Sequence, residues 1–159
     1  IYMALRIIKT EEDPILRKTS RPVTEFNDRL FTLLDDMKET MYKADGVGLA
    51  AVQVGVLRRA VVIDCGDGFL ELINPEIIKT SGRQKETEGC LSLPGKSGIT
   101  LRPSKVKVKA QDRHGEWHEY SGEDLKARCF CHEIDHLDGI LFTDKLARGE
   151  EVMLDEDGE

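Results

Sequence analysis

The sequence has no long hydrophobic run, no internal repeat and no low-complexity tract. A membrane-spanning helix needs roughly 18 apolar residues in a row, so a helical membrane protein is not expected. No signal peptide is visible, and the cytoplasm is therefore the expected location. Basic residues are fewer than acidic ones, 23 compared with 30, and the net charge is -7. Broad binding to nucleic-acid phosphates needs a basic surface, so no direct nucleic-acid specificity is expected.

Cysteine is scarce, with residues only at positions 65, 90, 129 and 131. Two disulfides are numerically possible, but reduced thiols are expected because the chain has no visible secretory signal and is long enough to bury its own core. With 159 residues, the chain is expected to form one domain over residues 1–159. Residues 1–2 precede Met3 and are expected to be an addition ahead of the natural start. The acidic residues 150–159 are expected to form a flexible tail.

Hydrophobic spacing predicts one amphipathic helix and several strands. Apolar residues recur three and four positions apart from Phe26 to Met41, and Asp45-Gly46 is the expected end of this helix. β-branched or alternating segments predict strands at 59–64, 70–73, 105–110 and 116–120. Asn74-Pro75 is expected to close the second of these strands, and His114-Gly115 is expected to form the turn before the last.

A second helix is expected from Ser121-Gly122-Glu123-Asp124 to Asp138-Gly139. Ser121 can accept a hydrogen bond from the backbone in the first turn, and glycine after the last turn favours termination. The resulting mixture of strands and two helices lacks βαβ alternation. The predicted fold class is therefore α+β, a compact single domain with antiparallel or mixed strands around this second helix.

The second helix carries the most informative motif, His132-Glu133-Ile134-Asp135-His136, which has the form HExxH. Residues four apart lie on the same helical face, one turn apart, so both imidazoles can reach one metal ion. Glu133 projects beside them, where a carboxylate can act on a water molecule. The motif predicts a metal-dependent hydrolase with a central HExxH helix.

Two histidines leave a metal ion short of the three protein ligands that catalytic zinc-type sites usually have. A metzincin would have a third histidine at position 142, which is Phe142 here. Glu150 and Glu151 lie in a polar tail with no helix to hold them, so a thermolysin-like ligand is also disfavoured.

The cysteines are the other candidates for the third ligand. Cys129 lies seven residues from His136, roughly 10 Å along a helix axis, and is expected to line the pocket instead. Cys131 and Cys65 are expected to pack as small hydrophobes. Cys90 lies in a short apolar run with glycine on both sides, which suits close approach to a ligand. Its spacing alone leaves a structural role and a metal-ligand role equally open.

Three motifs occur together in a characteristic order. They read Gly46-Val47-Gly48-Leu49-Ala50-Ala51-Val52-Gln53, Glu88-Gly89-Cys90-Leu91-Ser92 and His132-Glu133-Ile134-Asp135-His136-Leu137. In combination they closely resemble the three signature motifs of peptide deformylases, and weaker likeness extends from Asp13 to Phe142. The short loops resemble the type 1 bacterial form of that family.

The resemblance implies removal of the formyl group from the N-terminal formyl-methionine of newly made proteins. It implies one divalent metal held by Cys90, His132 and His136, with Fe(II) in the cell and Zn, Ni or Co as substitutes in a purified sample. Glu133 would act as general base and then as general acid. The side-chain amide of Gln53 and the backbone N–H of Leu91 would stabilise the oxyanion of the tetrahedral intermediate.

The resemblance also implies substrate-binding residues. Val47, Gly48 and Gly89 would contact the peptide, and Cys129 would line the methionine pocket together with Val47 and Leu91. Arg102 would support the Cys90 loop, the alternative being a solvated surface arginine. The expected partners are the formyl-methionyl N-termini of nascent chains, with transient ribosome contact and no membrane.

Departures from the family and rival functions are also visible. Cys131 stands where the family usually has Gln, and Arg128 makes the pocket wall less aliphatic. The acidic tail differs from the basic helix with which some members dock on ribosomes. A small metalloprotease, a structural zinc module and a cysteine hydrolase that uses Cys90 are the competing interpretations.

Overall fold

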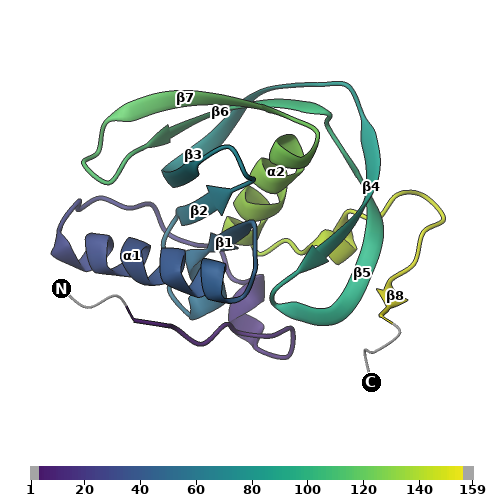
Figure 1. Cartoon of the computed structure of the whole chain (residues 1–159), viewed down its shortest axis with the longest axis horizontal. Helices are drawn as coiled ribbons and strands as arrows, with labels where there is room; N and C mark the ends of the chain where they lie inside the picture. The colour runs from purple at the N-terminus through teal and green to yellow at the C-terminus, as the bar shows by residue number, and fades with distance from the viewer. Residues whose placement is uncertain (1–3, 156–159) are drawn as a thin grey trace.

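The structure, a computed structural model, describes residues 4–155 (Figure 1). Residues 1–2, expected to be an addition to the chain, and residues 156–159 of the expected tail lie outside this range. The described strands form two antiparallel sheets, one ordered β1-β2-β3-β6-β7 and the other β4-β5-β8. The α+β fold class is confirmed. The bounds are α1 Asp28–Lys43, α2 Leu125–Leu137, β1 Gly48–Ala50, β2 Ala60–Asp64, β3 Phe69–Ser81, β4 Gln84–Cys90, β5 Leu93–Arg102, β6 Lys105–Gln111, β7 Trp117–Glu123 and β8 Met153–Leu154.

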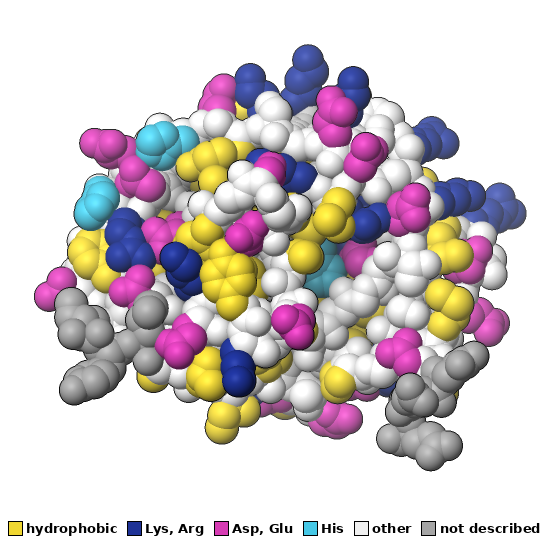
Figure 2. Space-filling model, in the orientation of Figure 1, with side chains coloured by type: hydrophobic (Ala, Val, Ile, Leu, Met, Phe, Trp, Pro, Cys, Tyr) yellow, Lys and Arg dark blue, Asp and Glu magenta, His cyan; other side chains and the backbone are white. Residues whose placement is uncertain are grey.

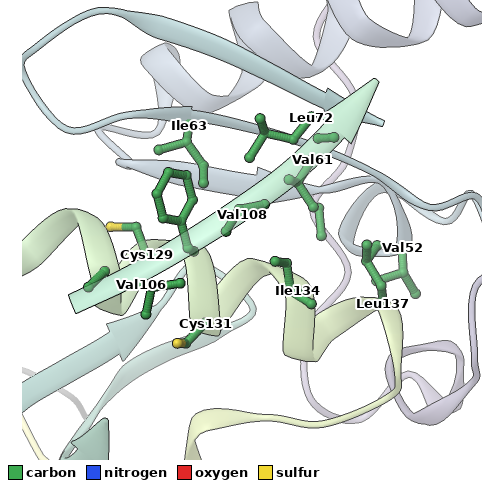
Figure 3. Packing of buried hydrophobic residues seen from close by; sticks show 14 residues of the cluster. Val52, Val61, Ile63, Leu72, Val106, Val108, Cys129, Cys131, Ile134 and Leu137 are labelled. Carbon is green, nitrogen blue, oxygen red and sulfur yellow. The ribbon is translucent and has the colours of Figure 1, made fainter. Parts of the chain in front are cut away.

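Helices α1 and α2 cover opposite faces of the larger sheet at β2. Successive strand residues point to opposite faces, so Val61 and Ile63 pack with α2 whereas Val62 packs with α1. Figure 3 shows this core between α2 and the sheet, with Ile134 and Leu137 contributed by the helix. Because both faces of β2 are covered, the strand is almost entirely buried and holds α2 in a fixed position.

The amphipathic helix predicted from Phe26 to Met41 is confirmed as α1. Its first turn is capped by the Asn27 side chain, which accepts a hydrogen bond from the backbone N–H of Leu30. The expected end differs in detail, because the left-handed residue is Asp45, with φ of 55°, and not Gly46. A Cβ at Gly46 would lie 2.7 Å from the Leu91 side chain, which would have to shift.

The prediction that Asn74-Pro75 ends a strand is wrong, because β3 continues to Ser81. The register with β6 shifts between Ile73 and Glu76, and Asn74 adopts a positive φ of 52° at this bulge. The Asn74 side chain accepts a hydrogen bond from Val23 N–H and donates one to the Val23 carbonyl. These bonds replace the ladder contacts that the irregular backbone gives up.

The predicted start of the second helix is also wrong, because Ser121 lies in β7 and α2 begins at Leu125. Ser121 is paired with Lys107 of β6, so the long-range ladder takes precedence over the local capping signal. The end agrees with the prediction. Leu137 closes the helix, and Gly139 has a φ of 73° where a Cβ would lie 2.5 Å from the Arg17 carbonyl oxygen.

Part of the acidic segment 150–159 pairs with another strand. Residues Met153–Leu154 form β8 and pair with Ser97 and Lys96 of β5, although their side chains are exposed. Within the described range, no helix combines the length and apolar character needed to cross a membrane.

Candidate metal centre and active site

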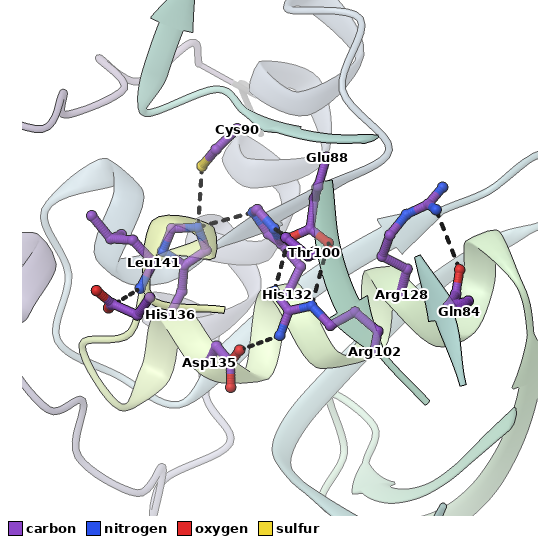
Figure 4. Close-up of polar contacts among 11 residues, drawn as sticks. Gln84, Glu88, Cys90, Thr100, Arg102, Arg128, His132, Asp135, His136 and Leu141 are labelled. Carbon is purple, nitrogen blue, oxygen red and sulfur yellow. Dashed lines mark hydrogen bonds and ion pairs between the residues drawn. The ribbon is translucent and has the colours of Figure 1, made fainter. Parts of the chain in front are cut away.

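Helix α2 and the end of β4 bring Cys90, His132 and His136 together (Figure 4). The Cys90 Sγ atom lies 3.3 Å from His136 Nε2, which lies 3.2 Å from His132 Nε2. All three ligand atoms lie within 4.8 Å of one another, the spacing expected of donors around one ion. A thiolate and two imidazoles are a donor set that suits a divalent transition metal.

The Glu88 carboxylate fixes the orientation of His132. Glu88 Oε2 lies 2.7 Å from His132 Nδ1, which leaves Nε2 of that ring directed at Cys90 and His136. Burial disfavours the Glu88 anion, but hydrogen bonds from His132 and Arg102 outweigh it and lower the pKa of Glu88 to about 2. Glu88 belongs to the second sequence motif, but the motif alone does not reveal this role. The contact between Glu88 and His132 joins residues 44 positions apart.

Arg102 is buried, with 4% of its surface exposed, so the alternative of a solvated arginine is wrong. Its Nη2 donates to Glu88 Oε2 at 2.8 Å, and its Nη1 donates to Asp135 at 2.5 Å. Thr100 donates a further hydrogen bond to Glu88 at 3.0 Å. Arg102 therefore joins β4, which ends at Cys90, to the helix that carries both histidines.

Glu133 lies buried beside the three ligand atoms. Its carboxylate passes so close to β1 that a Cβ atom at Gly48 would lie 2.5 Å from Glu133 Oε2. Burial raises the pKa of Glu133 to about 7. A carboxylate with a pKa near neutrality can both accept and return a proton at physiological pH.

Gln53 reaches the same point from the short helix Ala51–Val54. Its Oε1 accepts a hydrogen bond from Ala50 N–H at 2.9 Å, and this bond fixes which end of the amide is the donor. The Nε2 atom then donates to Ser92 Oγ at 3.1 Å and lies 3.6 Å from Cys90 Sγ. The amide N–H groups of Gln53 are thus directed at the ligand cluster.

A cavity of about 400 Å³ opens onto this cluster. In Figure 2 a histidine side chain is visible between hydrophobic side chains near the centre of the molecule. The cavity is bounded by β1, β4 and one face of α2, where Leu125, Arg128 and Cys129 precede His132 and Glu133. The residues expected to bind substrate all line it, namely Val47, Gly48, Gly89, Leu91 and Cys129.

The other positions considered for the third metal ligand do not contribute a ligand atom to the cluster. Phe142 is buried and stacks on the His132 ring, with ring centroids 6.5 Å apart. Glu150 and Glu151 are exposed. Within residues 4–155, the cluster at α2 contains three protein ligands and no fourth, which disfavours a structural zinc module. Cys131 is a residue of α2 whose side chain is buried in the core, as expected, and it does not line the cavity.

The chain is similar to known proteins along most of its length. A family model described as polypeptide deformylase matches residues 5–152. The chain is 60% identical to the peptide deformylase of Alkaliphilus metalliredigens over 146 residues, which cover 92% of this chain and 99% of the relative. It is 57% identical to that of Acetivibrio thermocellus over 155 residues, covering 98% and 89% of the two chains.

Solved structures resemble the fold as well. The peptide deformylase of Thermotoga maritima matches with a TM-score of 0.88 and 43% identity, covering 90% of this chain and 98% of that one. The peptide deformylase of Synechococcus elongatus in complex with actinonin matches with a TM-score of 0.86 and 35% identity, covering 94% and 87%.

Proposed function

The chain belongs to the peptide deformylase family, and we propose that Cys90, His132 and His136 hold the divalent metal on which its activity depends. The enzyme is a hydrolase that removes the formyl group from the N-terminal methionine of nascent peptides. The observation that supports this assignment of residues is the convergence of one thiolate and two imidazoles beside the buried Glu133 carboxylate.

We propose Fe(II) as the metal in the cell, on the resemblance to the family, with Zn, Ni or Co able to occupy the same thiolate and imidazole ligands in a purified sample. When bound, the metal supplies Lewis-acid polarisation of the formyl carbonyl and acidifies a water molecule. Glu88 holds Nδ1 of His132, so the free Nε2 of that ring is the ligand atom. His136 lies within the same cluster and offers its own Nε2.

The cavity walls explain how a peptide can be held. β1 is an edge strand of the larger sheet and β4 is an edge strand of the smaller one, and both line the cavity. We assign Val47, Gly48 and Gly89 to backbone contacts with an extended peptide that lies between these edges. Cys129, together with Val47 and Leu91, then lines the pocket for the methionine side chain.

Catalysis follows from the positions of Glu133, Gln53 and Leu91. Glu133 takes a proton from the attacking water, and it returns that proton to the leaving amine as the C–N bond breaks. Negative charge develops on the former formyl oxygen, and the Gln53 amide and the Leu91 backbone N–H donate hydrogen bonds to it. One such donor is typically worth about 2.7–4 kcal/mol of barrier.

Metal analysis combined with a formate-release assay on formyl-Met-Ala tests this function. We expect one equivalent of metal, stoichiometric formate and no cleavage of internal peptide bonds. Protein prepared without oxygen should be more active than protein prepared in air, because a ferrous site with a thiolate ligand is open to oxidation. Cleavage of internal bonds would favour a metalloprotease, and equal activity in both preparations would favour zinc or nickel.

We place the reaction in the cytoplasm, where nascent chains acquire their formylated N-termini, and we propose transient contact with the ribosome. Residues Met153–Leu154 of the acidic segment form a strand that pairs with β5. Cosedimentation with ribosomes that carry nascent chains, compared with empty ribosomes, tests this contact.

A further inference from the structure

Phe142 packs against the proposed metal ligands without lining the substrate cavity. Its side chain is 1% exposed and stacks on the His132 ring, with the ring centroids 6.5 Å apart and the ring planes inclined by 19°. Phe142 also belongs to a small hydrophobic cluster with three buried leucines, and Cys90 packs against this cluster. Phe142 and its neighbours therefore contact one ligand from α2 and one from the end of β4.

Two contacts restrain the His132 ring in different ways. The hydrogen bond between His132 Nδ1 and Glu88 Oε2, at 2.7 Å, fixes the direction of that nitrogen, but one hydrogen bond leaves the ring free to turn about the line that joins the two atoms. A second ring stacked on the imidazole face blocks this rotation, because close-packed interiors leave no room for the ring to turn. The observed separation lies within the range of about 4.5–7 Å over which aromatic rings attract each other. Phe142 therefore supplies the restraint that Glu88 does not.

His136 depends on the same restraint. A metal-binding histidine usually has its other nitrogen held by a carboxylate or a carbonyl. His136 Nδ1 is buried, and within residues 4–155 no hydrogen-bond partner contacts it. Instead, the His136 and His132 rings meet edge to face at 70°, with their centroids 4.9 Å apart and their Nε2 atoms 3.2 Å apart (Figure 4). A turn of the His132 ring would therefore displace the Nε2 atoms of both histidines.

Contacts on both sides hold Phe142 in place. Phe142 begins the short helix Phe142–Asp144, where Leu141 N–H donates to Asp144 Oδ2 at 3.1 Å. Arg17 Nη1 donates to the same carboxylate at 2.5 Å. At the ring itself, Gly98 of β5 carries no side chain, and a Cβ there would lie 3.4 Å from Phe142 Cε2. The ring thus lies in a fixed position between β5 and the His132 imidazole.

We propose that Phe142 is a positioning residue whose ring sets the orientation of His132, and through it that of His136, so that both Nε2 atoms converge with Cys90 Sγ on one ion. This inference rests on the proposed assignment of the metal ligands. Removal of the ring should speed metal dissociation, within the range of about 10–100-fold by which contacts that support metal ligands change affinity. Because Phe142 does not line the cavity, kcat should fall while KM for formyl-Met-Ala stays unchanged.

The test compares variants loaded with Co(II), whose absorption spectrum reports the arrangement of its ligands. Phe142→Leu and Phe142→Ile remove the ring and keep an apolar side chain, whereas Phe142→Tyr keeps the ring. Phe130→Leu is the matched control, because Phe130 is equally buried but packs in the core between α2 and the larger sheet. Chelator competition measures the rate of metal dissociation, and thermal melting measures the stability of each variant.

Phe142→Leu and Phe142→Ile should shift the Co(II) absorption, release the metal at least about 10-fold faster and lower kcat alone. Phe142→Tyr and Phe130→Leu should keep the wild-type absorption and dissociation rate, whatever their melting temperatures. Wild-type absorption and dissociation in the ringless variants, or changes of the same size in Phe142→Tyr or Phe130→Leu, would overturn the proposal. Failure of the proposed ligand assignment is distinguishable, because the wild-type protein itself would then show no thiolate-to-cobalt charge-transfer band.

Discussion

Gly48 and Glu133 both line the cavity and contact each other. This contact leaves no room for a side chain at position 48. A Cβ at position 48 would meet Oε2 of Glu133 at 2.5 Å and two of its carbon atoms at 2.9 Å. Glu133 is buried but lines the cavity, so a Cβ at position 48 would push its carboxylate away from its present position. The glycine therefore determines where the proposed general base lies.

We expect Gly48→Ala to lower kcat/KM for formyl-Met-Ala while the metal stays bound. Displacing the base should cost a loss within the range of about 10²–10⁴-fold that general base catalysis contributes. Equal activity of Gly48→Ala and wild type would show that Glu133 does not need its present position.

Glu88 offers a second test at the same scale, because it orients His132 without lying among the three ligand atoms. Glu88→Gln keeps the shape but removes the charge, and loss of such a supporting carboxylate typically weakens metal binding by about 10–100-fold. Competition with a chelator measures this affinity. Glu86→Gln, an exposed position on the same strand, should leave it unchanged. An unaltered affinity in Glu88→Gln would contradict the orienting role.

The residues of the site were largely predictable from the sequence, but their partners were not. Periodicity placed His132, Glu133 and His136 on one helical face. Spacing alone left Cys90 undecided, and only the family resemblance favoured it as a ligand. The contacts of Glu88 with His132 and Arg102 escaped prediction because they join positions that are far apart in the sequence.

Among the elements, β3 departs most from its local sequence signals. Asn74 holds the bulge in place, with a positive φ of 52° and side-chain hydrogen bonds to both backbone groups of Val23. A proline follows it, which in isolation predicts the end of a strand. The ladder with β6 resumes beyond the bulge and carries the strand to Ser81.

We expect Asn74→Ala to lower the free energy of unfolding by about 2–4 kcal/mol, since it removes partly buried hydrogen bonds and strains a left-handed backbone. Asn74→Gly loses the same hydrogen bonds but tolerates the positive φ, so it should be less destabilised. Urea denaturation of both variants measures the difference. If the two variants were equally stable, backbone strain would play no part at this bulge.

Elements with strong local patterns were predicted well, and those that depend on distant partners were not. In β6 buried and more exposed side chains alternate, as the sequence of 105–111 predicts. In α1 the buried residues are the apolar positions three and four apart. β4 is mostly polar and exposed, and its strand character comes from pairing with β5. Ser121 likewise does not cap a helix, because it pairs with a distant residue, Lys107, in the ladder between β6 and β7.

The whole molecule forms its site where two sheets and one helix meet. β1 and β4 are edge strands of different sheets, and α2 lies against both walls of the cavity between them. No local pattern encodes such a meeting of edges, so the sequence predicted the α+β class but not the cavity of about 400 Å³. Three of the residues lining this cavity on β1, β4 and the segment before β1 are glycines, namely Gly46, Gly48 and Gly89.

Metal content and formate release measured on the same preparation of Glu133→Ala separate metal binding from proton transfer. We assign metal retention to Cys90, His132 and His136, and proton transfer to Glu133. We therefore expect one equivalent of metal, as in wild type, with formate release from formyl-Met-Ala reduced to background. Near-normal formate release by this variant would show that Glu133 is not the general base.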